Sequence, residues 1–244
     1  MNLVKTKSQF KYSIFRITNF CKQELLAFGV LLISNSYFSQ SFTQEEKKVF
    51  LSEKVVFFGY DFSHFKLAEI KRLHEPNQKK YIPDWIDFLN QRRDERSYEK
   101  RLQKYEVVFD FDYTLESMRK YDESEMIVIS KHILQRESLQ TIIDSVWSKK
   151  HTYGIGFITI VECFEKQSKT ASAYFVFFDI LSKEILMVDY YARKGADGYG
   201  MKNYWGTGMS EIITHYLADV YEKNLKRFNR GKTRKKPSKY EIVN

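Results

Sequence analysis

Three apolar runs separated by short polar breaks constrain the fold more than any other part of the chain. They are Ile155–Phe164, Ala171–Ile180 and Glu184–Tyr191. Runs of about eight to ten residues that are rich in Ile, Val, Phe and Tyr and broken this tightly are typical of strands joined by hairpins. The stretch 155–191 is therefore expected to form a three-stranded antiparallel meander.

Both faces of these predicted strands are apolar. Because side chains alternate along a strand, the first run divides into Ile155, Phe157 and Val161 on one face and Ile158, Ile160 and Phe164 on the other. Strands that are apolar on both sides are covered on both sides. One cover is predicted to be a helix from Thr207 to about Leu225, with the apolar stripe Met209, Ile212, Ile213, Tyr216, Leu217 and Val220. The other is either the earlier helices or a partner molecule.

The N-terminal segment has the parts of a secretory signal peptide. A basic stretch ends at Lys22, the apolar run Leu25–Ile33 follows, and small polar residues lead to a plausible cleavage site after Ser39. The apolar run is too short to span a bilayer comfortably, although a membrane anchor or a buried helix remains the alternative. Residues 1–39 are therefore predicted to direct export to the periplasm or the medium, and the mature chain is expected to have no transmembrane span.

The formal charge of +9 is concentrated at the two ends of the chain. Residues 1–39 carry five basic side chains against one acidic, and residues 225–244 carry eight against one. Removing these contributions, +4 and +7, leaves about −2 for residues 40–224, so the body of the protein is close to neutral. No nucleic-acid partner is expected. The tail 226–244 is predicted to be disordered and to contact acidic envelope surfaces.

Shorter patterns predict the elements before the apolar runs. Thr43 and Glu46 have capping-box spacing, which predicts a short helix through Phe50. Lys54–Ser63 is expected to be a strand whose end carries Asp61 and Ser63. These two side chains and His64 cannot form a catalytic triad, because neighbours on a strand point to opposite faces. They are expected to turn the chain.

The segment Val107–Leu115, VVFDFDYTL, is the sharpest motif in the sequence. It resembles the first signature of haloacid-dehalogenase-type phosphatases, an apolar strand that ends in DxDxT-L. The resemblance implies that Asp110 is the phosphoryl-accepting nucleophile and Asp112 an acid/base, with Thr114 completing the motif. The apolar strand that ends at Ser130 is similar to the second signature of the same family.

The remaining signatures of that family are missing. About fifteen residues separate Thr114 from Ser130, too few for a helical crossover together with the family's inserted elements. No lysine stands in an assignable signature. The alternative interpretation is a second strand with an acidic end, and a single short motif without its structural context favours that alternative.

A glycine-rich segment with aromatic residues, 195–208, follows the last apolar run. It lacks the spacing of dinucleotide-binding and P-loop motifs, so it is expected to be a loop that crosses the end of the sheet. The candidate binding residues there are Tyr199, Asn203, Tyr204 and Trp205, and packing of the aromatic rings on the sheet is the alternative. No cofactor is predicted. No metal site is predicted either, because His132 and His151 have no His or Cys partner at ligand spacing.

The order of the predicted elements indicates a single α/β domain over residues 40–225, with a mixed sheet of about five strands and helices packed on its faces. This order, over residues 54–225, resembles the small α/β domain of cell-envelope proteins such as the TolB amino-terminal domain and the curli-secretion lipoprotein. The resemblance implies an exported, non-enzymatic protein that binds or assembles other envelope components. The alternative function is a phosphatase that uses Asp110 and Asp112.

Overall fold

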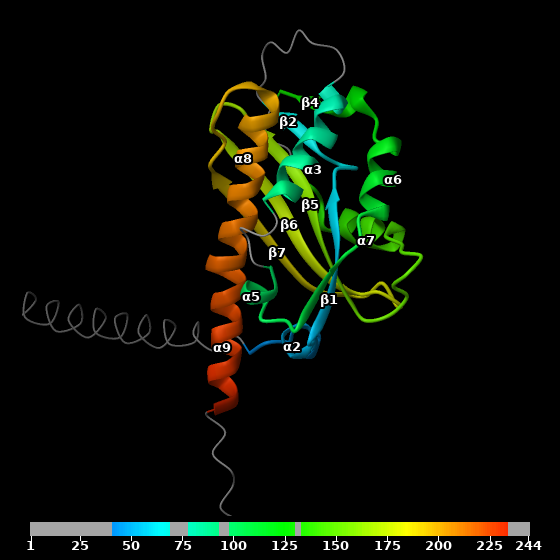
Figure 1. The fold of residues 1–244 in the computed structure, drawn as a ribbon, viewed down its shortest axis with the longest axis vertical. Helices are drawn as coiled ribbons and strands as arrows, with labels where there is room; N and C mark the ends of the chain where they lie inside the picture. The colour runs from blue at the N-terminus through cyan, green and yellow to red at the C-terminus, as the bar shows by residue number, and fades with distance from the viewer. Residues whose placement is uncertain (1–40, 69–77, 93–97, 130–132, 234–244) are drawn as a thin grey trace, which may run out of the picture. The chain divides into compact units, whose positions relative to one another are not determined.

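The computed structural model describes residues 41–68, 78–92, 98–129 and 133–233. The architecture below is that of the described residues from Thr43 onward (Figure 1). The predicted signal peptide, Ser130 and His132 lie outside the described residues.

The sheet combines parallel and antiparallel pairing. Its strands are β1 (Lys54–Asp61), β2 (Lys66–Ala68), β3 (Glu106–Phe109), β4 (Ile127–Val128), β5 (Ile155–Glu165), β6 (Thr170–Asp179) and β7 (Ile185–Lys194). Strand β1 pairs in parallel with β3 and β5, and β2 pairs in parallel with β4 and β5. Strands β5, β6 and β7 pair antiparallel in chain order. The expected α/β class is therefore confirmed.

Within the described residues the sheet has seven strands, whereas about five were predicted. Strands β1 and β2 lie end to end along the same side of β5, β1 against residues 156–160 and β2 against residues 163–165. Strands β3 and β4 are divided in the same way, because β3 pairs with β1 and β4 pairs with β2. Two positions in the sheet are thus each filled by two short strands.

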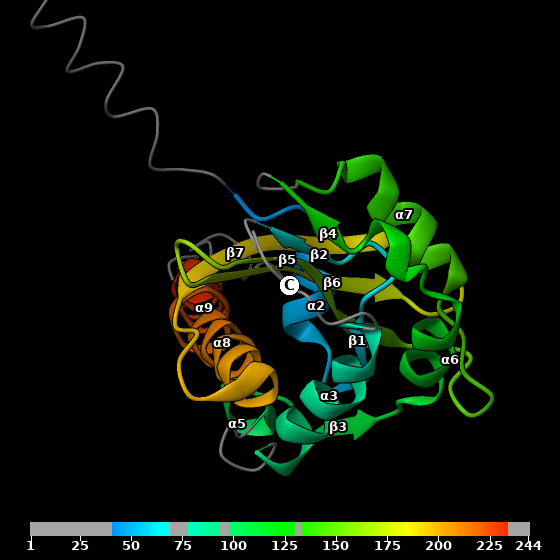
Figure 2. The same ribbon diagram turned by 90° about the horizontal axis from the view of Figure 1, so that it is seen from above.

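Helices lie on both faces of the sheet (Figure 2). Their bounds are α2 (Gln44–Leu51), α3 (Tyr81–Gln91), α5 (Tyr98–Leu102), α6 (Asp112–Lys120), α7 (Arg136–Ser145), α8 (Gly200–His215) and α9 (Glu222–Thr233), with 3₁₀ turns at Gln78–Lys80 and Glu123–Glu125 and a π-helical turn at Tyr216–Tyr221. Helices α3, α5, α8 and α9 lie on one side of the sheet and α6 and α7 on the other. The predicted capping box is confirmed, because Thr43 and Glu46 exchange side-chain and backbone hydrogen bonds at the start of α2.

Aromatic stacking fills the core between the sheet and helices α8 and α9. Phe157 stacks on Phe177 with a centroid distance of 4.4 Å, and Phe175 stacks on Tyr216 at 3.8 Å. On the opposite face, helix α7 covers the centre of the sheet with Leu139, Ile142 and Ile143, which pack in one cluster with strand residues such as Ile158 and Val176. The second cover that the sequence left open is therefore α7.

A β-bulge between Val161 and Cys163 changes the facing of the end of β5. The sequence predicted Phe164 on the same face as Ile160, but Phe164 stacks on Trp205 of α8 at 4.5 Å whereas Ile160 packs with α7. The prediction is wrong because a bulge inserts one extra residue and reverses the alternation beyond it. The inserted residue is Glu162, whose side chain is fully buried.

The closing helix is longer than predicted at both ends. It begins at Gly200, so most of the expected glycine-rich loop is the first part of α8. It continues through residues 222–233 as α9, so the predicted disordered tail does not begin at residue 226. The continuation is stabilised by packing, since Phe228 is buried and stacks on Phe50 of α2 at 5.2 Å. Residues 234–244 lie outside the described part of the chain.

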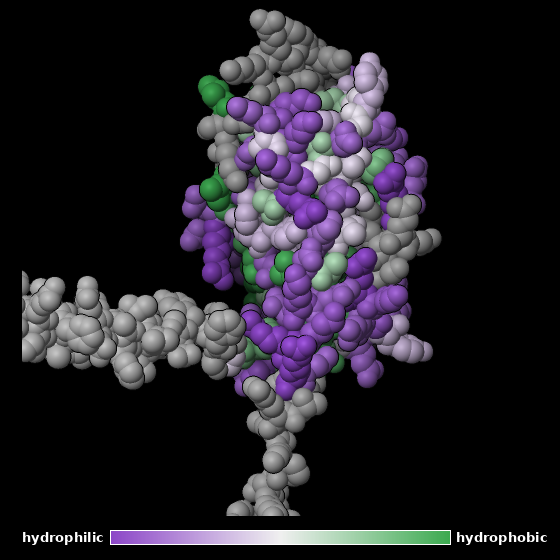
Figure 3. Space-filling view, turned by 90° about the vertical axis from the view of Figure 1, so that its left-hand side faces the viewer, coloured by the Kyte–Doolittle hydropathy of each residue, from purple (hydrophilic) through white to green (hydrophobic). Residues whose placement is uncertain are grey.

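The side of the molecule that carries α8 and α9 is mostly hydrophilic, with small and scattered apolar patches (Figure 3). Across the described ranges, no helix combines the length and the apolarity required to cross a bilayer.

Candidate functional site

Asp110, the predicted nucleophile, lies directly after β3 and is 5% exposed. Its carboxylate accepts a hydrogen bond from Ser148 Oγ at 2.6 Å and another from the backbone N–H of Asp112 at 3.1 Å. Ser148 Oγ in turn accepts the backbone N–H groups of Lys150 and His151, at 3.0 and 2.9 Å. The carboxylate therefore anchors the loop that leads from α7 to β5.

Thr114, the third residue of the DxDxT motif, supports an irregularity in β1. The register of β1 against β5 shifts between Phe57 and Tyr60, where Gly59 has a φ of +80°. Thr114 Oγ1 donates to the carbonyl of Phe58 at 2.8 Å and accepts the N–H of Tyr60 at 2.9 Å. Because buried backbone groups need hydrogen-bond partners, the threonine satisfies two that the irregular strand leaves unpaired.

A second buried carboxylate lies at the end of β1. Asp61 Oδ2 accepts a hydrogen bond from Tyr113 OH at 2.7 Å, and Oδ1 accepts the N–H and the hydroxyl of Ser63. Burial and the neighbouring Asp61 raise the pKa of Tyr113 well above its ordinary value, so the phenol keeps its proton and serves as a donor. The expectation that Asp61 and Ser63 turn the chain is confirmed.

Asp110 thus lies in the short connection between β3 and α6, and Asp112 and Thr114 lie in the first turn of α6. Asp112 is the first residue of α6. Strand β4, which precedes Ser130, pairs with β2 and not with β3. Within the described part of the chain, no group of three or more His, Cys, Asp or Glu side chains is arranged to hold a metal ion.

The four candidate binding residues at the start of α8 have different surroundings. Tyr199 is 95% exposed, and Asn203 is also exposed and donates to the carbonyl of Tyr199 at 3.2 Å. Tyr204 is half-buried beneath the ammonium group of Lys166, 3.7 Å from its ring centroid. Trp205 is fully buried against the sheet. Only the first two present their side chains fully to solvent.

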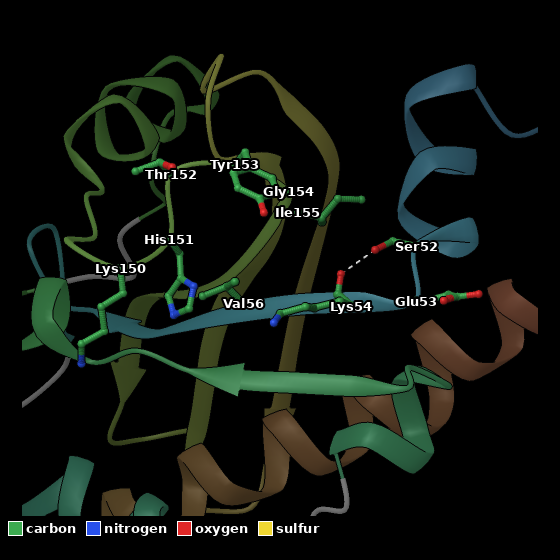
Figure 4. A pocket seen from close by; sticks show the side chains of 10 residues that line it. All are labelled: Ser52, Glu53, Lys54, Val56, Lys150, His151, Thr152, Tyr153, Gly154 and Ile155. Carbon is green, nitrogen blue, oxygen red and sulfur yellow. Dashed lines mark hydrogen bonds between the residues drawn. The ribbon is translucent and has the colours of Figure 1, made fainter.

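The candidate site is a cavity of about 490 Å³ between the start of β1 and the loop that precedes β5 (Figure 4). It is lined by Ser52, Glu53, Lys54, Val56, Lys150, His151, Thr152, Tyr153, Gly154 and Ile155. Its volume falls within the range of roughly 300–1,000 Å³ that small-molecule sites occupy. The cavity can therefore hold a small organic molecule.

Polar and apolar side chains share the lining of this cavity. Figure 4 shows the side chains of His151 and Tyr153 beside the space above Val56, that of Lys54 running along β1 with its ammonium group toward β3, and those of Glu53 and Lys150 pointing away. Lys54 also forms an ion pair with Glu106 of β3 at 2.9 Å. The Lys54 ammonium group can only donate hydrogen bonds, whereas the His151 imidazole and the Tyr153 hydroxyl can donate and accept them.

Sequence reasoning did not identify this cavity. Its two halves lie about a hundred residues apart in the chain and come together because residue 56 pairs with residue 156. The polar segment 148–154 between α7 and β5 was a local signal, but no recognised motif includes it.

Comparison with known proteins gives no assignment: no protein-family model matches the chain, and no curated protein matches it.

Proposed function

We propose that the chain is an exported, non-enzymatic binding protein of the cell envelope that recognises its ligand in the cavity between β1 and the 148–155 loop. The observation that carries the proposal is that the acidic motif and the open cavity are separate, and that the motif serves the fold. The carboxylate of Asp110, which a phosphatase would need as its nucleophile, is buried and anchors the loop through Ser148, whereas the open cavity is lined by hydrogen-bonding side chains such as Lys54 and His151. The signal-like sequence of residues 1–39 supports the export part of the proposal.

A pull-down from an envelope fraction tests the binding function. The purified chain is expected to retain an envelope component that a Lys54→Met/His151→Asn double variant does not retain. Both side chains lie at the surface of the cavity, so their replacement is expected to leave the fold intact, which circular dichroism checks. Equal retention by both chains contradicts the proposed role of the cavity.

The phosphatase alternative rests on the DxDxT-L match at Asp110, Asp112 and Thr114. Incubation of the purified protein with p-nitrophenyl phosphate and Mg²⁺ separates the two functions. We expect no turnover above that of buffer. Turnover that is lost in Asp110→Asn would overturn the non-enzymatic proposal, provided that the control Asp122→Asn, at an exposed aspartate outside the motif, leaves it unchanged.

We also propose that the basic C-terminal end contacts acidic envelope surfaces. Helix α9 presents the exposed basic side chains Lys223, Lys226, Arg227 and Arg230. Two of them, Lys223 and Lys226, form exposed i,i+4 pairs with acidic residues, which screen their charge only weakly. Co-sedimentation is expected with phosphatidylglycerol vesicles and not with phosphatidylcholine vesicles, and equal binding to both contradicts this contact.

A further inference from the structure

Three of the side chains that line the cavity carry hydrogen-bond donors. They are the ammonium group of Lys54, the imidazole of His151 and the hydroxyl of Tyr153. We propose that this cavity binds a small amphipathic anion, with a carboxylate or phosphate group held by these donors. This inference rests on the proposed binding function and specifies the chemistry of its ligand.

The positive charge at this point is not fully neutralised by the protein. Lys54 and its partner Glu106 are 52% and 47% exposed in their side chains, so their ion pair is solvated and weak. The carboxylate of Glu53 points away from the cavity. An anion that enters therefore meets an ammonium group that is still able to donate charge-assisted hydrogen bonds.

The apolar part of the lining indicates the chemistry of the part of the ligand that is not charged. Val56 is 3% exposed in the floor of the cavity, and Ile155 lies at its side. Val56 is already withdrawn from solvent, so the apolar surface that a short hydrocarbon body can still cover is that of the partly buried Ile155 and of Tyr153, which is 80% exposed. A bare inorganic ion covers neither of them. A carboxylic acid or phosphate ester with a short apolar chain therefore fits better than free phosphate.

The loop that carries His151 and Tyr153 is held in place before any ligand binds. Ser148 Oγ accepts two successive backbone N–H groups of the loop and donates to the buried carboxylate of Asp110. A site that is already ordered loses less conformational entropy on binding. Asp110 is therefore a positioning residue: it acts on the ligand only through Ser148 and the backbone of the loop.

The probes are hexanoate, hexyl phosphate, inorganic phosphate and the neutral hexanol, added to the purified protein and followed by amide chemical shifts in ¹H–¹⁵N spectra. Saturable shifts at residues 150–156 are expected with hexanoate or hexyl phosphate, weaker shifts with inorganic phosphate, and none with hexanol. The two amphipathic anions decide between a carboxylate and a phosphate ligand. Equal shifts with hexanol and hexanoate overturn the proposal, as does the absence of saturable shifts with both anions.

Matched variants are expected to change the Kd of the anion in opposite directions. Lys54→Met and His151→Asn are each expected to raise the Kd of the preferred anion about tenfold, the loss of one charge-assisted hydrogen bond. Glu106→Gln is expected to lower it, because it releases the ammonium group of Lys54. Lys149→Met, in the same loop but outside the lining, is the control and leaves the Kd unchanged. Unchanged affinity in both Lys54→Met and Glu106→Gln contradicts the assignment.

Failure of this inference is distinguishable from failure of the proposed function. If the chain retains an envelope component in a cavity-dependent way but no anion gives saturable shifts, the ligand class is wrong and the binding function stands. If p-nitrophenyl phosphate is hydrolysed with dependence on Asp110, the non-enzymatic function is wrong, and the shift titration still judges the anion site.

Discussion

Lys104 places an ammonium group inside the protein, next to the segment that forms one wall of the cavity. Its side chain is 6% exposed, and Nζ donates to the carbonyls of Val49 and Ser52 at 2.5 and 2.7 Å. These carbonyls lie at the C-terminal end of α2, where the last turn leaves acceptors unpaired. The lysine therefore ties α2 to the start of β3.

The stability of the fold is expected to depend on pH through Lys104. Burial lowers the pKa of Lys104 to about 8, while the unfolded chain keeps the ordinary value of about 10.4. Between these values the unfolded state binds more protons, so the free energy of unfolding rises with pH from about 8 to about 10. Urea denaturation of the wild type and Lys104→Met at pH 8 and pH 10 measures this. From pH 8 to pH 10 the free energy of unfolding of the wild type should rise relative to that of Lys104→Met. An equal difference at both pH values contradicts the prediction.

Tyr113 is the donor that satisfies the buried Asp61 carboxylate. Tyr113→Phe keeps the ring in its core cluster but removes the hydrogen bond to Oδ2. Leaving a buried acceptor unpaired is expected to lower the free energy of unfolding by about 1–3 kcal/mol. Tyr105→Phe, at a position that is 91% exposed, is the control with an expected change near zero. Equal urea midpoints for the two variants contradict the role assigned to Tyr113.

At the scale of elements, the turn between β5 and β6 contains a residue in the left-handed region. Lys169 has a φ of +57° and is exposed. Because a Cβ disfavours this conformation, Lys169→Gly is expected to raise the free energy of unfolding by up to about 1 kcal/mol. Gln167→Gly, at an exposed position of the same turn, should lower it slightly. Thermal melting of the two variants checks the opposite signs.

The elements that could be predicted from the sequence are those whose signals are local. The capping box at Thr43 and the strands between Ile155 and Lys194 follow from patterns of a few residues. The β-bulge in β5 and the π-helical turn could not be predicted, because such irregularities depend on tertiary packing. The π-helical turn at Tyr216–Tyr221 inserts an extra residue, so that Tyr221 and not the predicted Val220 is buried against the sheet.

The candidate site could be predicted only in fragments. The DxDxT segment drew attention to Asp110, but the hydrogen bond that Asp110 accepts from Ser148 depends on a loop whose conformation no local pattern specifies. Lys54 and His151 belong to no recognised motif, and they line one cavity only because β1 pairs with β5. Long-range parallel pairing leaves no periodicity in the sequence from which register can be read.

At the scale of the whole molecule, export gives a direct prediction. The native protein is expected to begin after Ser39, because the preceding residues have the parts of a signal peptide. Intact-mass measurement and N-terminal sequencing of the protein from an envelope or periplasmic fraction check the cleavage. Recovery of a chain that retains Met1 from the cytosol contradicts export.

The position of β1 between β3 and β5 also has a consequence for folding during synthesis. Val56 finds its partner Gly156 only after one hundred further residues have been synthesised, whereas β5, β6 and β7 pair with immediate neighbours. Contacts of such high sequence separation form late and slow folding. During this interval β1 can pair with β3 on one edge, but the edge of its apolar segment KVVFFGYD that pairs with β5 stays open, and open apolar edges aggregate when exposed. A holdase that covers this segment until β5 has been translated would therefore raise the yield of folded protein more than one that acts on the hairpins.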